Sequence, residues 1–313
     1  MKTTQFERAI FLSWYCAKGD CKFCYMSTQK NLIKSPKKAR RSFASILAEA
    51  IICKKLGWKI EFLSGGYESF TKKELLFLIK NIYKIYGEKL WLNIGVLSKE
   101  DLKLFKPYIK GVCGAIETIN PKLHDYICPS KPIRPIEKMF KSCDELNLQK
   151  GMTIIIGVGE TIKDFQLLKK FIKKHKIEKI TFYRLKPQKN TIFYGKKMPS
   201  SEYYLEWVKK IRQEFPKLHI TVGSWLTHLD EISLLLKGGA NTITKFPSIK
   251  LFNSKFAKKI ENEAKKSNIK FIGTLTKLPK INVENAVSKL NINEKLKKNI
   301  KIKLKSYLSK MNQ

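Results

Sequence analysis

The sequence has little glycine and proline, 16 and 11 residues of 313, and it lacks long apolar runs. So little glycine and proline excludes a collagen-like chain and a chain that is disordered throughout. No apolar stretch reaches the roughly 20 residues that a membrane-spanning helix needs. Residues 1–10 include Lys2, Glu7 and Arg8 and resemble no secretion signal, so we expect a cytoplasmic protein without a membrane partner.

Acidic residues are also scarce, since 26 Asp and Glu accompany 63 Lys and Arg and leave a net charge of +37. The excess is nearly all lysine, spread in pairs such as Lys54-Lys55 and Lys169-Lys170 on stretches that we predict to be helical. An Arg-rich arm, an RNP-type aromatic strand and zinc-finger spacing are missing. The charge permits a nucleic-acid partner. Its distribution is more typical of solvated helix faces, so we do not expect dedicated nucleic-acid binding.

Short β-branched runs alternate with longer amphipathic stretches along most of the chain. Eight runs are predicted strands: residues 9–14, 59–63, 90–97, 111–117, 152–158, 179–185, 219–223 and 240–246. Helix-start signals lie between them, for example Thr71 with Glu74 as a capping box. This alternation predicts an α/β protein with a closed (β/α)8 TIM-type barrel in residues 1–250. We expect residues 251–313 to form a helical extension packed on the barrel.

The seven cysteines are odd in number, which argues against a disulfide framework. Cys16, Cys21 and Cys24 form a C-x4-C-x2-C spacing directly after the first predicted strand, at the barrel rim where active sites lie. Three thiolates from one loop suit a [4Fe-4S] cluster with one open iron. Zinc is the alternative, but a closed zinc site takes four ligands and no further Cys or His lies at a short spacing. We therefore favour the iron–sulfur cluster over a zinc-stabilised binding module.

This loop resembles the signature loop of the radical SAM superfamily, in which an aromatic residue, here Phe23, precedes the last cysteine. The first gap has four residues, where the superfamily most often has three. The resemblance implies an enzyme that cleaves S-adenosylmethionine (SAM) reductively at a [4Fe-4S] cluster. The resulting 5′-deoxyadenosyl radical takes a hydrogen atom from the substrate. It also implies a one-electron reductant such as ferredoxin or flavodoxin.

Further stretches resemble the biotin synthase-like branch of this superfamily, in consistent order over roughly residues 9–250. After the second strand, the segment 64–68 resembles the Gly-Gly-Glu element that contacts the methionine part of SAM, with Tyr67 at the usual acidic position. Residues 114–124 resemble the fourth-strand segment, residues 154–161 the adenine-contacting fifth-strand motif, and residues 238–243 the start of the eighth strand. The resemblance implies these cofactor-binding residues: Phe23, Gly65, Gly66, Glu68, Glu117, Thr118, Ile155 and Gly157.

Residues at the ends of the sixth and seventh strands are candidates for substrate contacts: Tyr183, Arg184, Lys186, Gln188, Trp225 and His228. A guanidinium such as that of Arg184 at a barrel mouth favours a substrate with a carboxylate or phosphate. Each candidate also has a structural alternative, since Tyr183 fits a core position and Lys186 an exposed rim position.

Biotin synthase holds a second iron–sulfur cluster in its barrel, and the corresponding positions here include Trp91, Gly151 and Thr221, which supply no thiolate. The protein either lacks such a cluster or builds one from Cys113, Cys128 and Cys143. We favour its absence, because single buried cysteines usually pack as small hydrophobes.

The expected substrate is a small or carrier-bound metabolite of cofactor biosynthesis. Sulfur insertion of the biotin or lipoyl synthase kind is one candidate reaction, and a rearrangement or methyl chemistry is another. An RNA-modifying radical SAM enzyme is the alternative that the +37 charge permits.

Overall fold

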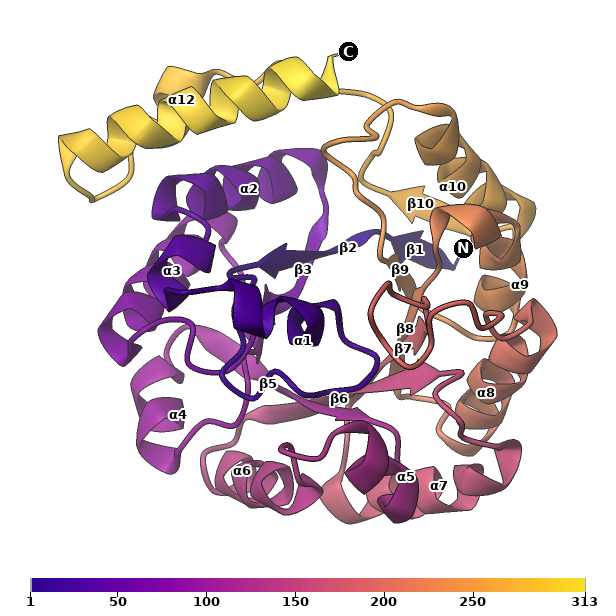
Figure 1. Cartoon of the computed structure of the whole chain (residues 1–313). Helices are drawn as coiled ribbons and strands as arrows, with labels where there is room; N and C mark the ends of the chain where they lie inside the picture. Colours follow the sequence, from indigo (N-terminus) through magenta and orange to yellow (C-terminus); the bar gives the residue numbers. More distant parts are fainter. Residues whose placement is uncertain (1, 313) are drawn as a thin grey trace.

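Eight parallel strands form a barrel in the computed structural model, which describes residues 2–312. The strands follow one another around the sheet in chain order (Figure 1). They are β2 (Glu7–Phe11), β3 (Lys59–Ser64), β4 (Leu90–Asn93), β5 (Ile109–Glu117), β6 (Gln149–Ile156), β7 (Lys179–Arg184), β8 (His219–Gly223) and β9 (Thr242–Thr244). A single parallel bridge from Phe6 to Ile243 brings the first and last strands together. The predicted (β/α)8 barrel is confirmed.

All eight predicted strands are present, and they differ from the prediction by a few residues at one or both ends. Strand β2 ends at Phe11, where the prediction ran to residue 14, because the chain turns there into the cysteine loop. Strand β4 ends at Asn93 instead of residue 97, and Gly95 follows with a φ of 100° that only glycine adopts freely. Both turns lie at the end of the barrel that carries the cysteines.

Helices surround the barrel on its outside, and one short helix, α1, lies over the barrel centre (Figure 1). They are α1 (Tyr25–Gln29), α2 (Phe43–Leu56), α3 (Lys72–Tyr86), α4 (Lys99–Phe105), α5 (Pro121–Ile127), α6 (Ile133–Glu145), α7 (Phe165–His175), α8 (Ser201–Glu214), α9 (Ile232–Lys237), α10 (Lys255–Lys266), α11 (Val283–Ser288) and α12 (Glu294–Met311). The predicted capping box starts α3, since the Glu74 backbone N–H donates to Thr71 Oγ1 at 3.3 Å and the Thr71 N–H to Glu74 Oε2 at 2.8 Å. None of the helices in residues 2–312 is both long and apolar enough to cross a bilayer.

A buried polar network fills the bottom of the barrel. Glu7 accepts hydrogen bonds from Lys179 Nζ at 2.5 Å and from Thr242 Oγ1 at 2.8 Å, and His219 Nε2 lies 3.0 Å from it. Burial would raise the pKa of Glu7, but the charge of Lys179 and the hydrogen bond and charge of His219 outweigh it, so the pKa is lowered. This network closes the barrel at the end opposite the cysteine loop and ties four strands together, β2, β7, β8 and β9.

After the barrel, the chain packs back against it in two places. Strand β10 (Lys270–Ile272) pairs with β1 (Thr3–Gln5) in a two-stranded parallel sheet. Helix α12 packs against α2, and its own side chains Ile300 and Leu304 are buried.

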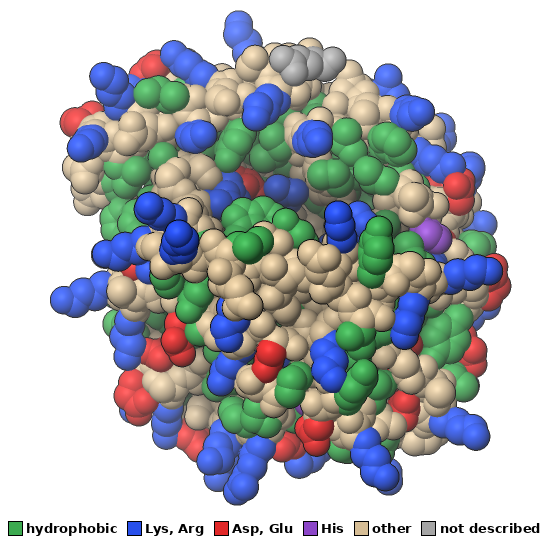
Figure 2. Space-filling view, in the orientation of Figure 1, with side chains coloured by type: hydrophobic (Ala, Val, Ile, Leu, Met, Phe, Trp, Pro, Cys, Tyr) green, Lys and Arg blue, Asp and Glu red, His purple; other side chains and the backbone are tan. Residues whose placement is uncertain are grey.

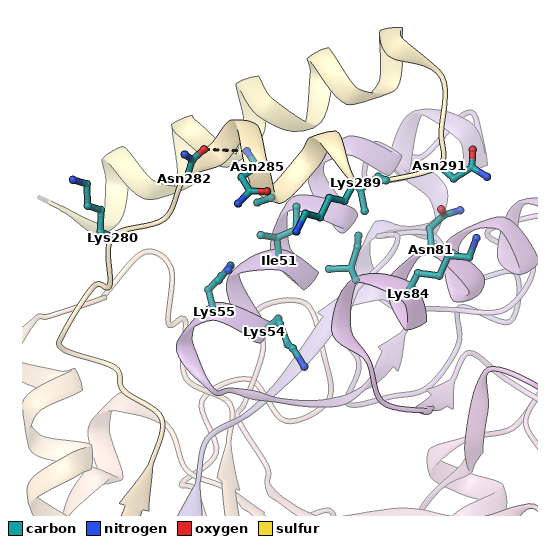
Figure 3. Close-up of a pocket in the computed structure, with 13 residues that line it drawn as sticks. Ile51, Lys54, Lys55, Asn81, Lys84, Lys280, Asn282, Asn285, Lys289 and Asn291 are labelled. Atoms are coloured by element: carbon teal, nitrogen blue, oxygen red, sulfur yellow. Dashed lines mark hydrogen bonds between the residues drawn. The ribbon is translucent and has the colours of Figure 1, made fainter.

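A pocket of about 520 Å³ lies on the outer wall between α2, α3 and the segment around α11 (Figure 3). Its lining includes Lys54, Lys55, Lys84, Lys280 and Lys289 and no carboxylate. None of these five lysines pairs with an acidic side chain among residues 2–312. The pocket therefore concentrates uncompensated positive charge on one side of the barrel.

Candidate active site

The three clustered cysteines lie on one loop between β2 and α1. Cys24 occupies the N-cap position of α1, and its backbone N–H donates to the Cys21 carbonyl oxygen at 3.0 Å. The Ser27 hydroxyl donates to the same carbonyl at 2.6 Å. These two bonds fix the C-x2-C turn, so that the sequence spacing becomes a rigid loop over the barrel (Figure 1).

The long first gap is spanned by a turn that depends on glycine. Gly19 has a φ of 49°, and a Cβ there would lie 2.9 Å from the Cys16 carbonyl oxygen. The Lys30 ammonium donates to the Lys18 carbonyl at 2.9 Å and holds the turn from outside. The fourth residue of the gap thus enlarges the loop while all three cysteines stay on it.

The second predicted motif packs directly beneath the cysteine loop. A Cβ on Gly66 would lie 2.6 Å from Cys16 Cα and would overlap the Tyr15 carbonyl oxygen. The Ala17 N–H donates to the Tyr67 carbonyl at 3.1 Å. Gly66 is therefore required by close approach of two backbones. At Gly65 a Cβ would meet nothing closer than 3.5 Å, and Glu68 is exposed with a φ of 58°.

The thiols of Cys21 and Cys24 lie in surroundings that favour the protonated form. The thiol of Cys21 contacts that of Cys128 and is mostly buried, and both effects raise its pKa. Burial raises the pKa of Cys24 to about 11. A metal must displace these protons on binding, so metal loading is coupled to proton release.

The loop fits a cluster better than a single ion. No three Cys, His, Asp or Glu side chains in residues 2–312 converge closely enough to hold one metal ion. A four-coordinate zinc site requires such convergence. A [4Fe-4S] cluster offers each thiolate a separate iron, so the three sulfurs need not meet at one point.

A buried ion pair lies beside the loop, at the end of β5. Lys131 Nζ donates to Glu117 Oε1 at 2.9 Å, and Thr153 Oγ1 lies 3.4 Å from the other carboxylate oxygen. Burial would lower the pKa of Lys131, but the charge of Glu117 outweighs it and raises the pKa. Glu117 has a φ of 64°, a conformation that is strained for any residue with a Cβ. The contacts with Lys131 and Thr153 fix the direction of the carboxylate.

His124 positions this ion pair. Its ring nitrogens lie 2.9 Å from the Ile116 carbonyl oxygen and 2.7 Å from the Lys131 carbonyl oxygen, so the imidazole joins the end of β5 to the loop after α5. The neighbouring Thr118 hydroxyl is buried and has no hydrogen-bond partner within residues 2–312. A buried hydroxyl without a partner is costly, and a bound ligand would satisfy it.

The residues predicted to contact adenine lie beside the loop. Ile155 is buried in a small apolar cluster that also contains Cys21, Cys128 and Phe23. Gly157 follows with a φ of 107°, and its N–H donates to Glu160 Oε1 at 2.7 Å. An apolar surface with exposed strand-end backbone suits a flat heterocycle.

A cavity of about 930 Å³ occupies the barrel mouth below the loop. Cys24 lines it, as do Trp14 and Tyr25, whose side chains are 51% and 46% exposed. Four predicted substrate residues also line it: Tyr183, Lys186, Gln188 and Trp225. The cavity thus joins a cluster cysteine to the substrate residues predicted from the later strands.

Cations and aromatic rings alternate on the cavity wall. Lys245 Nζ lies 4.2 Å from the centre of the Tyr183 ring, and Lys186 Nζ lies 4.8 Å from the centre of the Trp225 ring. The Tyr183 hydroxyl donates to Glu61 Oε1 at 2.6 Å, and burial together with the Glu61 charge raises the pKa of Tyr183. The positive charge of both lysines favours an anionic or electron-rich ligand.

Two predicted substrate residues do not reach the cavity. The guanidinium of Arg184 is buried, forms an ion pair with Glu231 and donates to Ser201 Oγ at 3.1 Å. Its hydrogen-bonding groups are used in joining β7 to the helices outside the barrel. His228 lies in the turn before α9, 2.8 Å from the Thr227 hydroxyl, and does not line the cavity.

The remaining cysteines considered for a second cluster are separated. Cys113 packs with Phe62 and Trp91 inside the barrel, Cys128 lies beside Cys21, and Cys143 lies in α6. They belong to three different apolar clusters. The structure does not bring them together as one ligand set.

Sequence reasoning missed the charged partners of the site. Lys131, Lys245 and Glu61 were not singled out, because each gains its role from a contact distant in the sequence. One signal was present for Glu61, a carboxylate within a predicted apolar strand, which needs a partner when buried. Lys131 carried no comparable signal, since it is one of many lysines.

Comparison with known proteins gives consistent results. The sequence pattern of the radical SAM superfamily matches residues 14–172. An uncharacterized protein of Methanocaldococcus jannaschii is 42% identical over 324 residues, which span 99% of this chain and 90% of the relative. The 7,8-didemethyl-8-hydroxy-5-deazariboflavin synthase of Archaeoglobus fulgidus is 27% identical over 195 residues, 59% of this chain and 58% of that protein. The structure of the FeFe-hydrogenase maturase HydG from Carboxydothermus hydrogenoformans superposes with a TM-score of 0.70 at 14% identity, over 98% of this chain and 78% of that one.

Proposed function

Because the chain belongs to the radical SAM superfamily, we propose that it abstracts hydrogen from a small or carrier-bound metabolite in cofactor biosynthesis. The observation that carries the proposal is the cavity of about 930 Å³ that Cys24 shares with the residues at the ends of β7 and β8. A reactive group formed at the cysteine loop is thereby enclosed with its substrate. The Archaeoglobus relative, a synthase of a small heterocyclic product, supports the substrate class.

Cys16, Cys21 and Cys24 are the proposed ligands of the [4Fe-4S] cluster. When bound, the cluster supplies an electron to SAM, which yields methionine and a 5′-deoxyadenosyl radical that takes hydrogen from carbon. Gly65 and Gly66 offer backbone atoms to the methionine part, and Glu117 and Thr118 offer a carboxylate and an unpartnered hydroxyl to the ribose.

Phe23, Ile155 and Gly157 are proposed to hold the adenine, since Phe23 and Ile155 share one apolar cluster and Gly157 directly follows β6. Glu68 is exposed and is proposed to contact the cofactor only at its outer edge. Tyr183, Lys186 and Trp225 are proposed to hold the substrate. The Arg184 guanidinium supports the wall from behind and is not proposed as a substrate ligand.

Anaerobic reconstitution with iron and sulfide tests the proposal, followed by dithionite and SAM and an assay for 5′-deoxyadenosine. The wild type should be brown and should form 5′-deoxyadenosine. Cys21→Ala should form none, because two thiolates do not retain the cluster. Cys53→Ala is the matched control, since Cys53 is a buried cysteine of α2 and its loss should leave the iron content unchanged. Equal product from wild type and Cys21→Ala would contradict the proposal.

An RNA substrate is the second candidate, and the lysine-lined pocket on the outer wall favours it (Figure 3). Retention of RNA that falls steeply with salt would support this candidate. Deuterium transfer from labelled metabolites into 5′-deoxyadenosine would identify a small substrate instead. Ferredoxin or flavodoxin is the proposed electron donor in either case.

A further inference from the structure

The barrel is only weakly closed between its first and last strands. Strands β2 and β9 stand at the two ends of the sheet, and the bridge from Phe6 to Ile243 is the one backbone pairing recorded between the two ends in residues 2–312. Above this bridge the Arg8 side chain occupies the seam, where its Nη1 donates to the Phe246 carbonyl oxygen at 3.3 Å. A side chain rather than a strand pairing therefore separates the barrel interior from the outer helices.

A second cavity of about 690 Å³ begins at this seam and extends beneath α12. It shares four lining residues with the barrel-mouth cavity: Arg8, Phe11, Trp14 and Pro247. The space-filling view shows a hollow in the upper part of this face, with basic and acidic side chains at its floor (Figure 2). We call this second cavity the seam groove.

The seam groove is positively charged and its arginines are fixed in place. Arg8 Nε and Arg41 Nη1 lie 2.6 Å and 2.7 Å from the two oxygens of Glu49, whose side chain is only 2% exposed. Arg41 Nη2 also donates to the Tyr307 hydroxyl of α12 at 3.1 Å. One carboxylate thus orients two guanidinium groups and compensates only one of their charges. The donors of Arg41 are occupied by Glu49, Ser45, Phe11 and Tyr307, so Arg41 contributes only its charge. Nη2 of Arg8 has no partner within residues 2–312 and can donate to a carboxylate or phosphate.

Two exposed lysines extend the positive charge to the groove's outer end. Lys250 and Lys310 line the groove and pair with no acidic side chain in residues 2–312. Four cations therefore surround one buried carboxylate. At the boundary with the barrel-mouth cavity lies Trp14, half-exposed and packed against Phe11 with 4.5 Å between ring centres. A ligand that passes from one cavity to the other crosses this ring.

We propose that the seam groove binds the anionic end of an extended substrate, a phosphate or carboxylate group, while the reacting carbon lies in the barrel mouth. The placement of the reacting carbon rests on the proposed function. The binding of the anionic end rests on the seam groove alone. The seam groove takes the anion-binding role that the sequence suggested for Arg184, because the Arg184 guanidinium is paired with Glu231.

Calorimetric titration of the full chain with pyrophosphate and, separately, with the tricarboxylate tricarballylate tests the proposal. The wild type should bind at least one of them, and the tighter of the two identifies the anionic group. Reversal of both outer charges, in the variant Lys250→Glu/Lys310→Glu, should weaken binding at least about tenfold. Lys303→Glu is the matched control, an exposed lysine of α12 outside the groove, and it should bind like wild type.

Absence of binding to the wild type overturns the proposal, and so does equal weakening by the double variant and by Lys303→Glu. Pyrophosphate binding requires neither cluster nor SAM, so the two proposals fail separately. A wild type that forms 5′-deoxyadenosine without binding either anion overturns the groove alone. A wild type that binds through Lys250 and Lys310 but forms no 5′-deoxyadenosine overturns the proposed function alone.

Discussion

At the scale of single residues, the pair of Glu117 and Lys131 links stability to the proposed cofactor site. Both side chains are nearly buried, with 12% and 7% of their surface exposed. Each charge is tolerated there because the other compensates it. A change at Lys131 therefore acts on the residue that we propose to contact SAM, although Lys131 does not line the cavity.

Lys131→Met should lower the free energy of unfolding by about 3–5 kcal/mol, because it leaves the Glu117 carboxylate buried without its partner. Denaturant unfolding followed by circular dichroism measures this loss. Lys122→Met is the control, since Lys122 is exposed on α5, and it should change stability by less than about 0.5 kcal/mol. The double variant Glu117→Gln/Lys131→Met should recover part of the loss; an additive effect would contradict the pairing.

Residue types that carry their own chemistry were predictable from the sequence, and residues defined by a partner were not. The spacing of Cys16, Cys21 and Cys24 placed the loop correctly after the first strand. Arg184 had the right chemistry for an anion, but its partner Glu231 lies 47 residues away and turns it from the cavity. The groove arginines could not be predicted for the same reason, because Glu49, which orients them, lies in α2, 41 residues after Arg8.

At the scale of elements, the alternation of apolar runs was sufficient to place every barrel strand, while the exact ends depended on turns. Strand β4 ends where Gly95 turns the chain, and helices such as α3 begin at local caps such as Thr71. The packing of one loop on another is harder to predict, because it depends on residues distant in the sequence. The contact between the Gly66 turn and the cysteine loop is an example.

Gly66→Ala should disrupt the cysteine loop, because its Cβ would lie 2.6 Å from Cys16 Cα and neither backbone has room to move. We expect a strongly reduced iron content after reconstitution. Gly65→Ala is the matched control: its Cβ would come no closer than 3.5 Å to the Ser69 hydroxyl, so the loop should load iron like wild type. Iron and sulfide analysis with absorbance at visible wavelengths measures both. Normal iron content in Gly66→Ala would show that the two turns move independently.

At the scale of the whole molecule, buried carboxylates make stability depend on pH. Burial would raise the pKa of Glu7 and of Glu49, but Lys179 with His219 in one case and Arg8 with Arg41 in the other outweigh it and lower the pKa. A lowered pKa in the folded state stabilises the fold above the ordinary value of 4.5, and this contribution is lost as pH falls below it. Burial raises the pKa of Glu61. The ionised Glu61 therefore destabilises the fold at neutral pH, and this cost is lost as pH falls.

Unfolding free energy should therefore fall steeply as pH decreases below about 4.5. Glu7→Gln should be less stable at neutral pH and should show a shallower decrease, because the group that gains a proton on unfolding has been removed. Denaturant titrations of both proteins over a pH series measure the two slopes. Parallel curves for wild type and Glu7→Gln would contradict the assigned role of Glu7.

The net charge of +37 has a second effect on the whole molecule. Lysines repel one another on the outer wall, most strongly around the pocket between α2, α3 and α11. Added salt screens this repulsion, so the melting temperature should rise between low and moderate ionic strength. Differential scanning calorimetry at several chloride concentrations measures the rise, and an unchanged melting temperature would show that the repulsion is already compensated.

The split between β2 and β9 also bears on how large a molecule the protein can process. A sealed barrel admits only what fits inside it, whereas a side exit lets most of a long molecule remain in bulk water while one end is enclosed. Under the proposed function, the weakly closed seam would let a group that is still tethered to a bulky carrier react in place, without prior release and later reattachment.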